Sequence, residues 1–219
     1  MAMAKKINLS KELILSEYSK FVLTEGKKPT SVYLFCQHLK VEESQFYQFF
    51  SNFEQLEESV FETFFENTSQ LLSASEEYAT YDAKTQLLSF YFTYFEQMTA
   101  NRSFVIHLLQ EHRNQLKNLK KLSGLRKHFK NFVDALEIEP IKIPQETIEK
   151  IQQKSISELA WIQFLMTLKF WIDDTSPSFE KTDLFIEKSV HASFDLIDMT
   201  PLKNIIDFGK FLWKEKVKM

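Results

Sequence analysis

The chain has 219 residues and a formal net charge of −3, with 22 phenylalanines but only three glycines and five prolines. So few helix-breaking residues favour long helices over hairpins and sheets, and they predict an all-α fold. The overall charge excludes a protein that is basic throughout. The single cysteine, Cys36, excludes an internal disulfide and a cysteine-rich zinc site, and it suits a reducing cytoplasm.

The first predicted helix begins at Ser10, whose hydroxyl can cap the free backbone amides of a helix N-terminus. Gly26 ends this helix, because glycine readily takes the left-handed conformation of a C-cap. Between them, apolar residues recur at helical spacing, which predicts one buried stripe. These residues are Ile14, Tyr18, Phe21 and Val22.

Two short helices follow, the first with Thr30 as its expected cap and the second from about Glu42 to Gln48. Lys40 and Val41 form the turn between them, so the pair is predicted to be a helix-turn-helix. The residues that the first of these helices is expected to bury are Val32, Phe35, Cys36 and Leu39. A longer helix then begins at Asn52, with Gln55 as its capping-box partner, and continues to about Leu72.

The rest of the chain alternates apolar helical periods with short polar or proline-containing connections. The pattern breaks at Ser123 and Gly124, and two prolines exclude a helix between Glu139 and Pro144. The further helices that we expect cover residues 83–99, 103–119, 145–173, 179–197 and 201–217, and another follows the break at Ser123 and Gly124 and reaches Leu136.

The first 66 residues carry a recognisable motif order: an aromatic pair in the first helix, Gly26, Thr30-Ser31-Val32, Val41, Phe46-Tyr47-x-x-Phe50 and Glu54-x-Leu56. This order, without gaps over residues 10–66, resembles the DNA-binding head of the TetR family of bacterial repressors. The resemblance implies a helix-turn-helix head in residues 1–52. It also implies a helical ligand-binding and dimerisation body in residues 53–219, of which 53–72 form the connecting helix.

The resemblance also assigns roles by position in the head. The positions that read bases in the major groove correspond to Ser44, Gln45 and Gln48, and glutamine can pair with adenine. The positions that hold phosphates correspond to Thr30 and Tyr47. The lysines that could add a salt-dependent attraction to DNA are Lys27, Lys28 and Lys40.

The same stretch departs from the family pattern in its charges. Glu42 and Glu43 stand where family members usually have serine and a small or basic residue, and Phe53 stands where they usually have lysine. No lysine or arginine lies between Val41 and Ala83, but ten acidic residues do. Acids stabilise a helix N-terminus, and a glutamate can accept from cytosine N4, so other roles for Glu42 and Glu43 stay open. Because carboxylates and phosphates repel, we expect weak or absent specific DNA binding.

Two functions of different classes follow. One is a transcriptional regulator whose body binds a small hydrophobic ligand. The other is a protein of the same fold that binds lipid and not DNA, similar to the lipid-binding accessory protein of ubiquinone biosynthesis. For the second, residues 201–219 combine five lysines with an apolar side and could contact an acidic membrane surface or partner. The alternative for this segment is a final helix that docks on the body.

Two further predictions concern the body. Aromatic residues crowd residues 90–98, and rigid walls with polar tips suit a flat or lipid-like ligand, although dense core packing is an equal alternative. The residues expected to bind this ligand are Tyr91, Tyr94, Phe95 and Met98. The resemblance also implies a homodimer whose interface is formed by residues 145–173 and 179–197. The former is apolar on several faces, although burial of both segments in the core of one chain is an equal alternative.

The sequence lacks the motifs of common enzymes. It has no glycine-rich phosphate loop, no Gly-x-Ser-x-Gly and no His-Glu-x-x-His, and its five histidines are scattered. We therefore predict that the protein is not an enzyme and holds no metal or cofactor.

Overall fold

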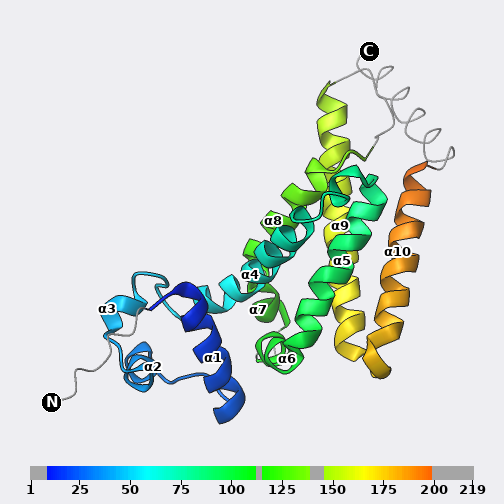
Figure 1. The fold of residues 1–219 in the computed structure, drawn as a ribbon. Helices are drawn as coiled ribbons and strands as arrows, with labels where there is room; N and C mark the ends of the chain where they lie inside the picture. Colours follow the sequence, from blue (N-terminus) through cyan, green and yellow to red (C-terminus); the bar gives the residue numbers. More distant parts are fainter. Residues whose placement is uncertain (1–8, 112–114, 139–145, 199–219) are drawn as a thin grey trace, which may run out of the picture. The chain divides into compact units, whose positions relative to one another are not determined.

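The computed structural model of the chain describes residues 9–111, 115–138 and 146–198. All regular secondary structure in these ranges is helical, so the predicted all-α class is confirmed (Figure 1). The described residues form two compact units. The first contains the residues up to Asn67 together with Phe95–His128, and the second contains Thr68–Tyr94 together with the residues from Phe129 onwards.

The first unit opens with three short helices, α1 (Lys11–Glu25), α2 (Val32–Leu39) and α3 (Glu43–Phe46). The predicted cap of α1 is confirmed, since Ser10 Oγ accepts a hydrogen bond from the backbone N–H of Leu13 at 3.2 Å. Gly26 ends α1 with a φ of 67°. The predicted cap of α2 is wrong: the capping hydroxyl belongs to Ser31, not Thr30, and accepts from the N–H of Leu34 at 3.2 Å.

Helix α3 is shorter than predicted, ending at Phe46 instead of Gln48. The carbonyl of Phe46 accepts from the N–H groups of Phe49 and Phe50 at 2.9 and 3.1 Å, which closes a turn. This turn brings the buried ring of Phe50 to 5.9 Å from that of Phe46. Packing of the two rings therefore replaces the last turn of the predicted helix.

Aromatic side chains form the core beneath these helices. The ring of Tyr18 lies 5.8 Å from Phe35 and 5.3 Å from Phe53, and Phe35 lies 6.3 Å from Phe46. All four are buried, as are Ile14, Val22 and Cys36. Val32 and Leu39, also predicted to be buried, are only half-buried.

Helix α4 (Phe53–Ser73) begins as predicted at Asn52, whose Oδ1 accepts from the N–H of Gln55 at 2.8 Å. The helices that follow are α5 (Ala83–Ala100), α6 (Arg102–Gln110), α7 (Gln115–Lys120) and α8 (Ser123–Ala135). The single helix predicted over 103–119 is therefore two helices. Near the end of α6, the carbonyl of Leu108 accepts a hydrogen bond from Lys121 Nζ at 3.0 Å.

Gly124 was predicted to interrupt the helical pattern, but it lies in the first turn of α8. The chain instead turns at Lys121 and Leu122, whose N–H groups donate to Asn118 and Leu119 carbonyls at 3.1 and 3.0 Å. Gly124 has no Cβ, which leaves room for the carboxylate of Glu62. A Cβ at this position would lie 1.6 Å from Glu62 Oε1.

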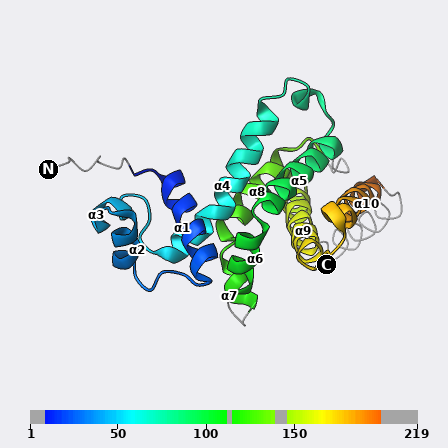
Figure 2. The same cartoon turned by 60° about the horizontal axis from the view of Figure 1, so that its bottom comes forward.

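The second unit is built around α9 (Glu146–Asp173) and α10 (Glu180–Asp198), which lie side by side in both views (Figures 1 and 2). Two short 3-10 helices, Tyr78–Thr80 and Pro177–Phe179, lie in its connections. The inner face of α9 buries Trp161, Phe164, Leu168 and Trp171. Their spacing of three or four residues places them on one stripe of the helix.

The turn from α9 to α10 is organised by the side chain of Asp174. Its Oδ1 accepts from the N–H and hydroxyl of Ser176 at 2.8 and 2.7 Å, and its Oδ2 accepts from those of Thr182 at 2.9 and 2.7 Å. Burial opposes ionisation of Asp174, but these hydrogen bonds outweigh burial and lower its pKa to about 2.

We expect Asp174→Ala to lower the free energy of unfolding by about 2 kcal/mol, because four donors lose their acceptor. The measurement is urea denaturation at neutral pH. The control is Asp173→Ala, since this exposed neighbour pairs with Lys169 on the surface and should change stability little. Equal losses for both variants would contradict the role of Asp174.

No described helix is long and apolar enough to cross a membrane. The predicted final helix and its proposed contact with an acidic surface fall on residues 201–219, outside the described ranges.

Candidate functional site

Six of the eight predicted DNA-binding residues have exposed side chains. They come from the α1–α2 loop, the turn after α2 and the segment around α3, and they are Lys27, Thr30, Lys40, Ser44, Tyr47 and Gln48. Lys40 occupies the left-handed region, with a φ of 58°, and its N–H donates to the carbonyl of Gln37 at 3.1 Å. This sharp turn separates α2 from α3, as a helix-turn-helix requires.

Gln45 is engaged within α3. Its Oε1 accepts from the backbone N–H of Glu42 at 3.1 Å, so the side chain caps the helix. A bidentate contact with adenine needs both the oxygen and the nitrogen of the amide. Gln45 must therefore leave its cap to read a base, whereas Gln48 is exposed. The signal in the sequence is a glutamine three residues after the cap position, as in a capping box.

The acids of α3 touch the predicted phosphate-binding tyrosine. The hydroxyl of Tyr47 donates to Glu43 Oε1 at 3.5 Å, a long hydrogen bond between exposed groups. Partial burial and the charge of Glu43 raise the pKa of Tyr47, so its hydroxyl stays protonated. Glu42 is exposed beside them. A phosphate that approaches the Tyr47 hydroxyl therefore meets the carboxylate of Glu43.

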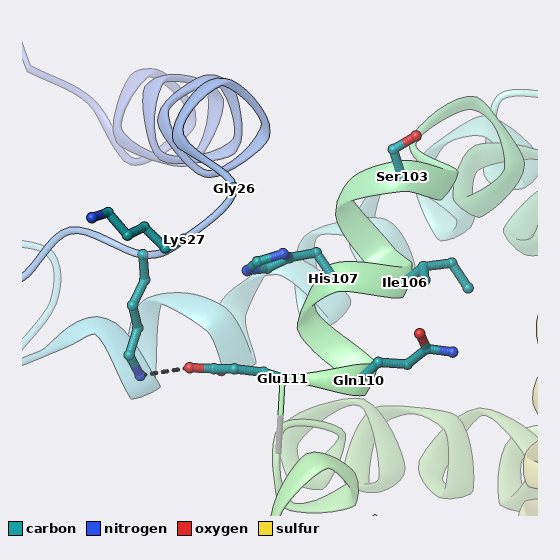
Figure 3. A pocket seen from close by; sticks show the side chains of 8 residues that line it. Gly26, Lys27, Ser103, Ile106, His107, Gln110 and Glu111 are labelled. Carbon is teal, nitrogen blue, oxygen red and sulfur yellow. Dashed lines mark ion pairs between the residues drawn. The ribbon is translucent and has the colours of Figure 1, made fainter. Parts of the chain in front are cut away.

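Sequence reasoning missed a chain of linked polar groups in the first unit, centred on the buried pair Glu57 and Lys121 and here called the buried ion network: Tyr18, Lys28, Glu57, Glu111 and Lys121. Tyr18 donates to Glu57 Oε1 at 2.5 Å, and Lys121 Nζ lies 2.8 Å from Glu57 Oε2. Lys121 also pairs with Glu111 Oε2. The other oxygen of Glu111 lies 2.8 Å from Lys28 Nζ, the dashed pair in Figure 3.

The network compensates charges that water does not reach. Glu57 is 1% exposed and Lys121 is 6% exposed, and burial of either charge alone would cost several kcal/mol. The ammonium of Lys121 meets three acceptors: two carboxylates and the carbonyl of Leu108. Two of these contacts are hydrogen bonds, to Glu111 Oε2 and to the carbonyl of Leu108, and the contact with Glu57 Oε2 is an ion pair at 2.8 Å.

The electrostatics of Glu111 follow from its two lysines. Burial opposes its ionisation, but hydrogen bonds from Lys121 and Lys28 outweigh burial and lower its pKa to about 2. Burial opposes the charge of Lys28, but Glu111 and neighbouring acids raise its pKa. Burial and the charge of Glu57 raise the pKa of Tyr18. At neutral pH Glu111 and Lys28 are thus ionised, and Tyr18 keeps its proton.

The pKa of Glu111 predicts acid sensitivity. The pKa of Glu111 is depressed from an ordinary 4.5 to about 2 in the folded protein. The ionised carboxylate therefore contributes fully to the free energy of unfolding above pH 4.5, and this contribution is lost as the pH falls to 2. We expect Lys28→Met to flatten the decline in unfolding free energy across this window, since Glu111 then loses one of the two lysines that lower its pKa. Urea denaturation at a series of pH values measures the slope. Lys20→Met, which removes an exposed lysine paired with Glu17, should leave the slope unchanged.

The network connects elements that are distant along the chain. Tyr18 lies on α1, Lys28 on the loop to α2, and Glu57 on α4, while Glu111 follows α6 and Lys121 follows α7. Two signals in the sequence could have shown it. Glu57 falls within the apolar period of α4, next to Leu56, and Glu111 is the single acid among eight basic residues in 102–130.

The predicted ligand-binding tyrosines lie in the aromatic core of the second unit. Tyr91 and Tyr94 are fully buried, and their rings lie 5.9 and 5.4 Å from that of Phe164. Tyr94 also stacks on Phe90 at 5.6 Å. The other two predicted residues, Phe95 and Met98, are buried and belong to the first unit. Ligand binding by these residues stays a prediction. Among the described residues, no three histidine, cysteine or acidic side chains are placed to hold a metal ion.

Comparisons with known proteins agree with this architecture. The family model described as "Tetracyclin repressor-like, C-terminal domain" matches residues 86–212, which is more than half of the chain. A solved structure described as "a protein with unknown function from Rhodococcus sp. RHA1" superposes with a TM-score of 0.52. It is 11% identical, and the match covers 90% of this chain and 100% of that chain, which shows a shared fold. No curated protein matches the sequence. The family match identifies the chain as a member of the tetracycline repressor-like (TetR) family.

Proposed function

We propose that this protein is a transcriptional regulator that binds DNA weakly through its helix-turn-helix head. The observation that carries the proposal is the exposure of six residues around α2 and α3 at the positions that meet DNA in the family: Lys27, Thr30, Lys40, Ser44, Tyr47 and Gln48. Lysines and hydroxyls of this kind position a protein on phosphates, and Gln48 supplies a base contact.

The affinity is weak because the same surface carries Glu42 and Glu43. Neither acid has a lysine partner among the described ion pairs, so each adds repulsion when the head approaches phosphates. Lys28 pairs with Glu111, so it must leave that partner before it can attract DNA.

The test is binding of the purified protein to its own upstream DNA, measured by fluorescence anisotropy over a series of salt concentrations. We expect micromolar or weaker binding at physiological salt and tighter binding at low salt. Gln48→Ala should lose preference for the specific site, while Lys40→Met should weaken specific and nonspecific binding alike. Absence of specific binding even at low salt would reject the proposal. Nanomolar binding at physiological salt would contradict the weak affinity but not the DNA binding itself.

The ligand of the body is proposed to be small and hydrophobic. Support comes from the buried aromatic walls around Tyr91 and Tyr94, which such a ligand would have to open because the rings are in contact. A compound that binds there should raise the melting temperature, and Tyr94→Ala should change its affinity. The lipid-binding alternative depends on residues 201–219 and is not favoured by the family match.

We further propose that α9 and α10 form a homodimer interface. Three apolar residues on one stripe of α9, opposite to its core stripe, are exposed: Leu159 (66%), Ile162 (52%) and Met166 (58%). Leu184 and Leu196 are exposed on α10. A stripe of this kind on a monomer would place large apolar side chains in water, and a second copy of the chain would cover them.

Ile162→Glu combined with Met166→Glu should convert the dimer into a folded monomer, since the new charges would be buried in the interface. Light scattering at micromolar concentration measures the mass, and circular dichroism confirms folding. The matched control, Gln70→Glu with Ala74→Glu, adds two acids at exposed positions near the end of α4 and should leave the dimer intact. A monomeric wild-type protein would contradict the interface.

A further inference from the structure

A pocket of about 590 Å³ lies between the α1–α2 loop and α6, within the first unit. Its polar lining comprises Lys27, Lys28, Ser103, His107, Gln110 and Glu111, and Gly26 and Ile106 complete it. The volume lies in the range of small-molecule sites, about 300–1,000 Å³. None of these residues has a role in the predicted ligand site of the body.

The polar groups of the pocket converge from its two walls. His107 and Glu111 are one helical turn apart and project from α6 toward the loop that carries Gly26 and Lys27 (Figure 3). The ion pair between Lys28 Nζ and Glu111 Oε1, at 2.8 Å, joins the loop to α6 at this point. Glu54 Oε1 lies farther from the same ammonium, at 4.0 Å.

The charge of the pocket favours an anion. Glu111 is the single acid of the lining, and both of its oxygens are already held, one by Lys28 and one by Lys121. Lys27 is exposed and has no ion-pair partner in the part of the chain that the structure describes. Among the lining residues, Lys28 is already paired with Glu111, so the one net positive charge is that of Lys27.

We propose that this pocket binds a small organic carboxylate, which takes Lys28 from Glu111. Lys28 already holds a carboxylate, so a ligand carboxylate fits the same geometry, and His107 can donate a second hydrogen bond. Replacing the Glu111 carboxylate with a ligand carboxylate changes the interaction free energy of Lys28 itself very little. The contacts of the ligand with His107 and the rest of the lining therefore decide its affinity.

The consequence for regulation rests on the proposed DNA binding. Lys28 ties the loop that leads into α2 to Glu111 and, through Lys121, to Glu57 on α4. A ligand that takes Lys28 frees this loop from the buried ion network. The pocket then supplies an effector site in the first unit, and this site shares no residue with the predicted ligand site at Tyr91 and Tyr94.

The test is titration of the full-length protein with succinate by isothermal calorimetry at low ionic strength. We expect saturable binding that Lys28→Met abolishes. Glu111→Gln should tighten it by about tenfold, because the internal competitor for Lys28 loses its charge. The opposite signs separate the proposal from misfolding, which would weaken binding in both variants. Lys20→Met, an exposed lysine on α1, is the control and should change nothing.

No saturable binding up to about 10 mM succinate, or weaker binding by Glu111→Gln, would overturn the proposal. Inorganic phosphate that binds as tightly as succinate would overturn the choice of a carboxylate. Because calorimetry needs no DNA, succinate binding without any DNA binding would reject the proposed function and leave this site standing. Specific DNA binding without succinate binding would reject this site and leave the proposed function standing.

Discussion

Lys121→Met is expected to lower the free energy of unfolding by about 3–5 kcal/mol, the cost of removing one partner from a buried ion pair. Methionine fills a similar volume, so the loss comes from charge and not from a cavity. Glu57, which is 1% exposed, would then face an apolar side chain at the place of its cation. Glu111 would lose its ion pair with Lys121 and keep the one with Lys28.

Urea denaturation at neutral pH measures this effect, and Lys120→Met is the matched control. Lys120 is the preceding residue but is exposed, so its replacement should change stability by less than about 0.5 kcal/mol. A further variant tests the electrostatic origin: Glu57→Gln and Glu111→Gln added to Lys121→Met should recover a large part of the loss, because no buried charge is left unpaired. Equal losses for Lys121→Met and Lys120→Met would show that the buried ion network contributes little.

Glu42→Ser combined with Glu43→Lys is expected to tighten DNA binding by about 100-fold at low salt, since like-charge contacts cost several kcal/mol. The two changes remove both carboxylates near Tyr47 and add one cation. If the new lysine reaches a phosphate, the slope of log K against log salt should steepen by about one unit per head.

The measurement is fluorescence anisotropy with the same DNA as for the wild type. The control, Glu76→Ser with Glu77→Lys, makes the same change of net charge at exposed positions outside the head and should alter affinity far less. An affinity that stays unchanged in the head variant would show that Glu42 and Glu43 do not face the DNA. A loss of affinity would indicate that one of them reads a base.

The local features of the fold were predictable from the sequence because their partners are close along the chain. Ser10 caps an amide three residues away, Asn52 does the same, and Gly26 needs no partner to take a positive φ. The apolar period placed α4 and α9 within a residue or two, and the order of motifs in the head indicated the family. The exchange of Thr30 for Ser31 as a cap shows the limit of this reasoning, because neighbouring hydroxyls are equivalent until the backbone is fixed.

Tertiary structure alone decided which charged residues pair. Tyr18 and Glu57 are 39 residues apart, and no local pattern indicates that they meet. Lys28 was predicted to attract DNA, but the fold places Glu111 at 2.8 Å from its ammonium. The physical reason is that a lysine side chain takes its partner from whatever the packed helices bring within reach. Hydrophobic periodicity fixes which helices form, while the charges that end up inside depend on how those helices pack.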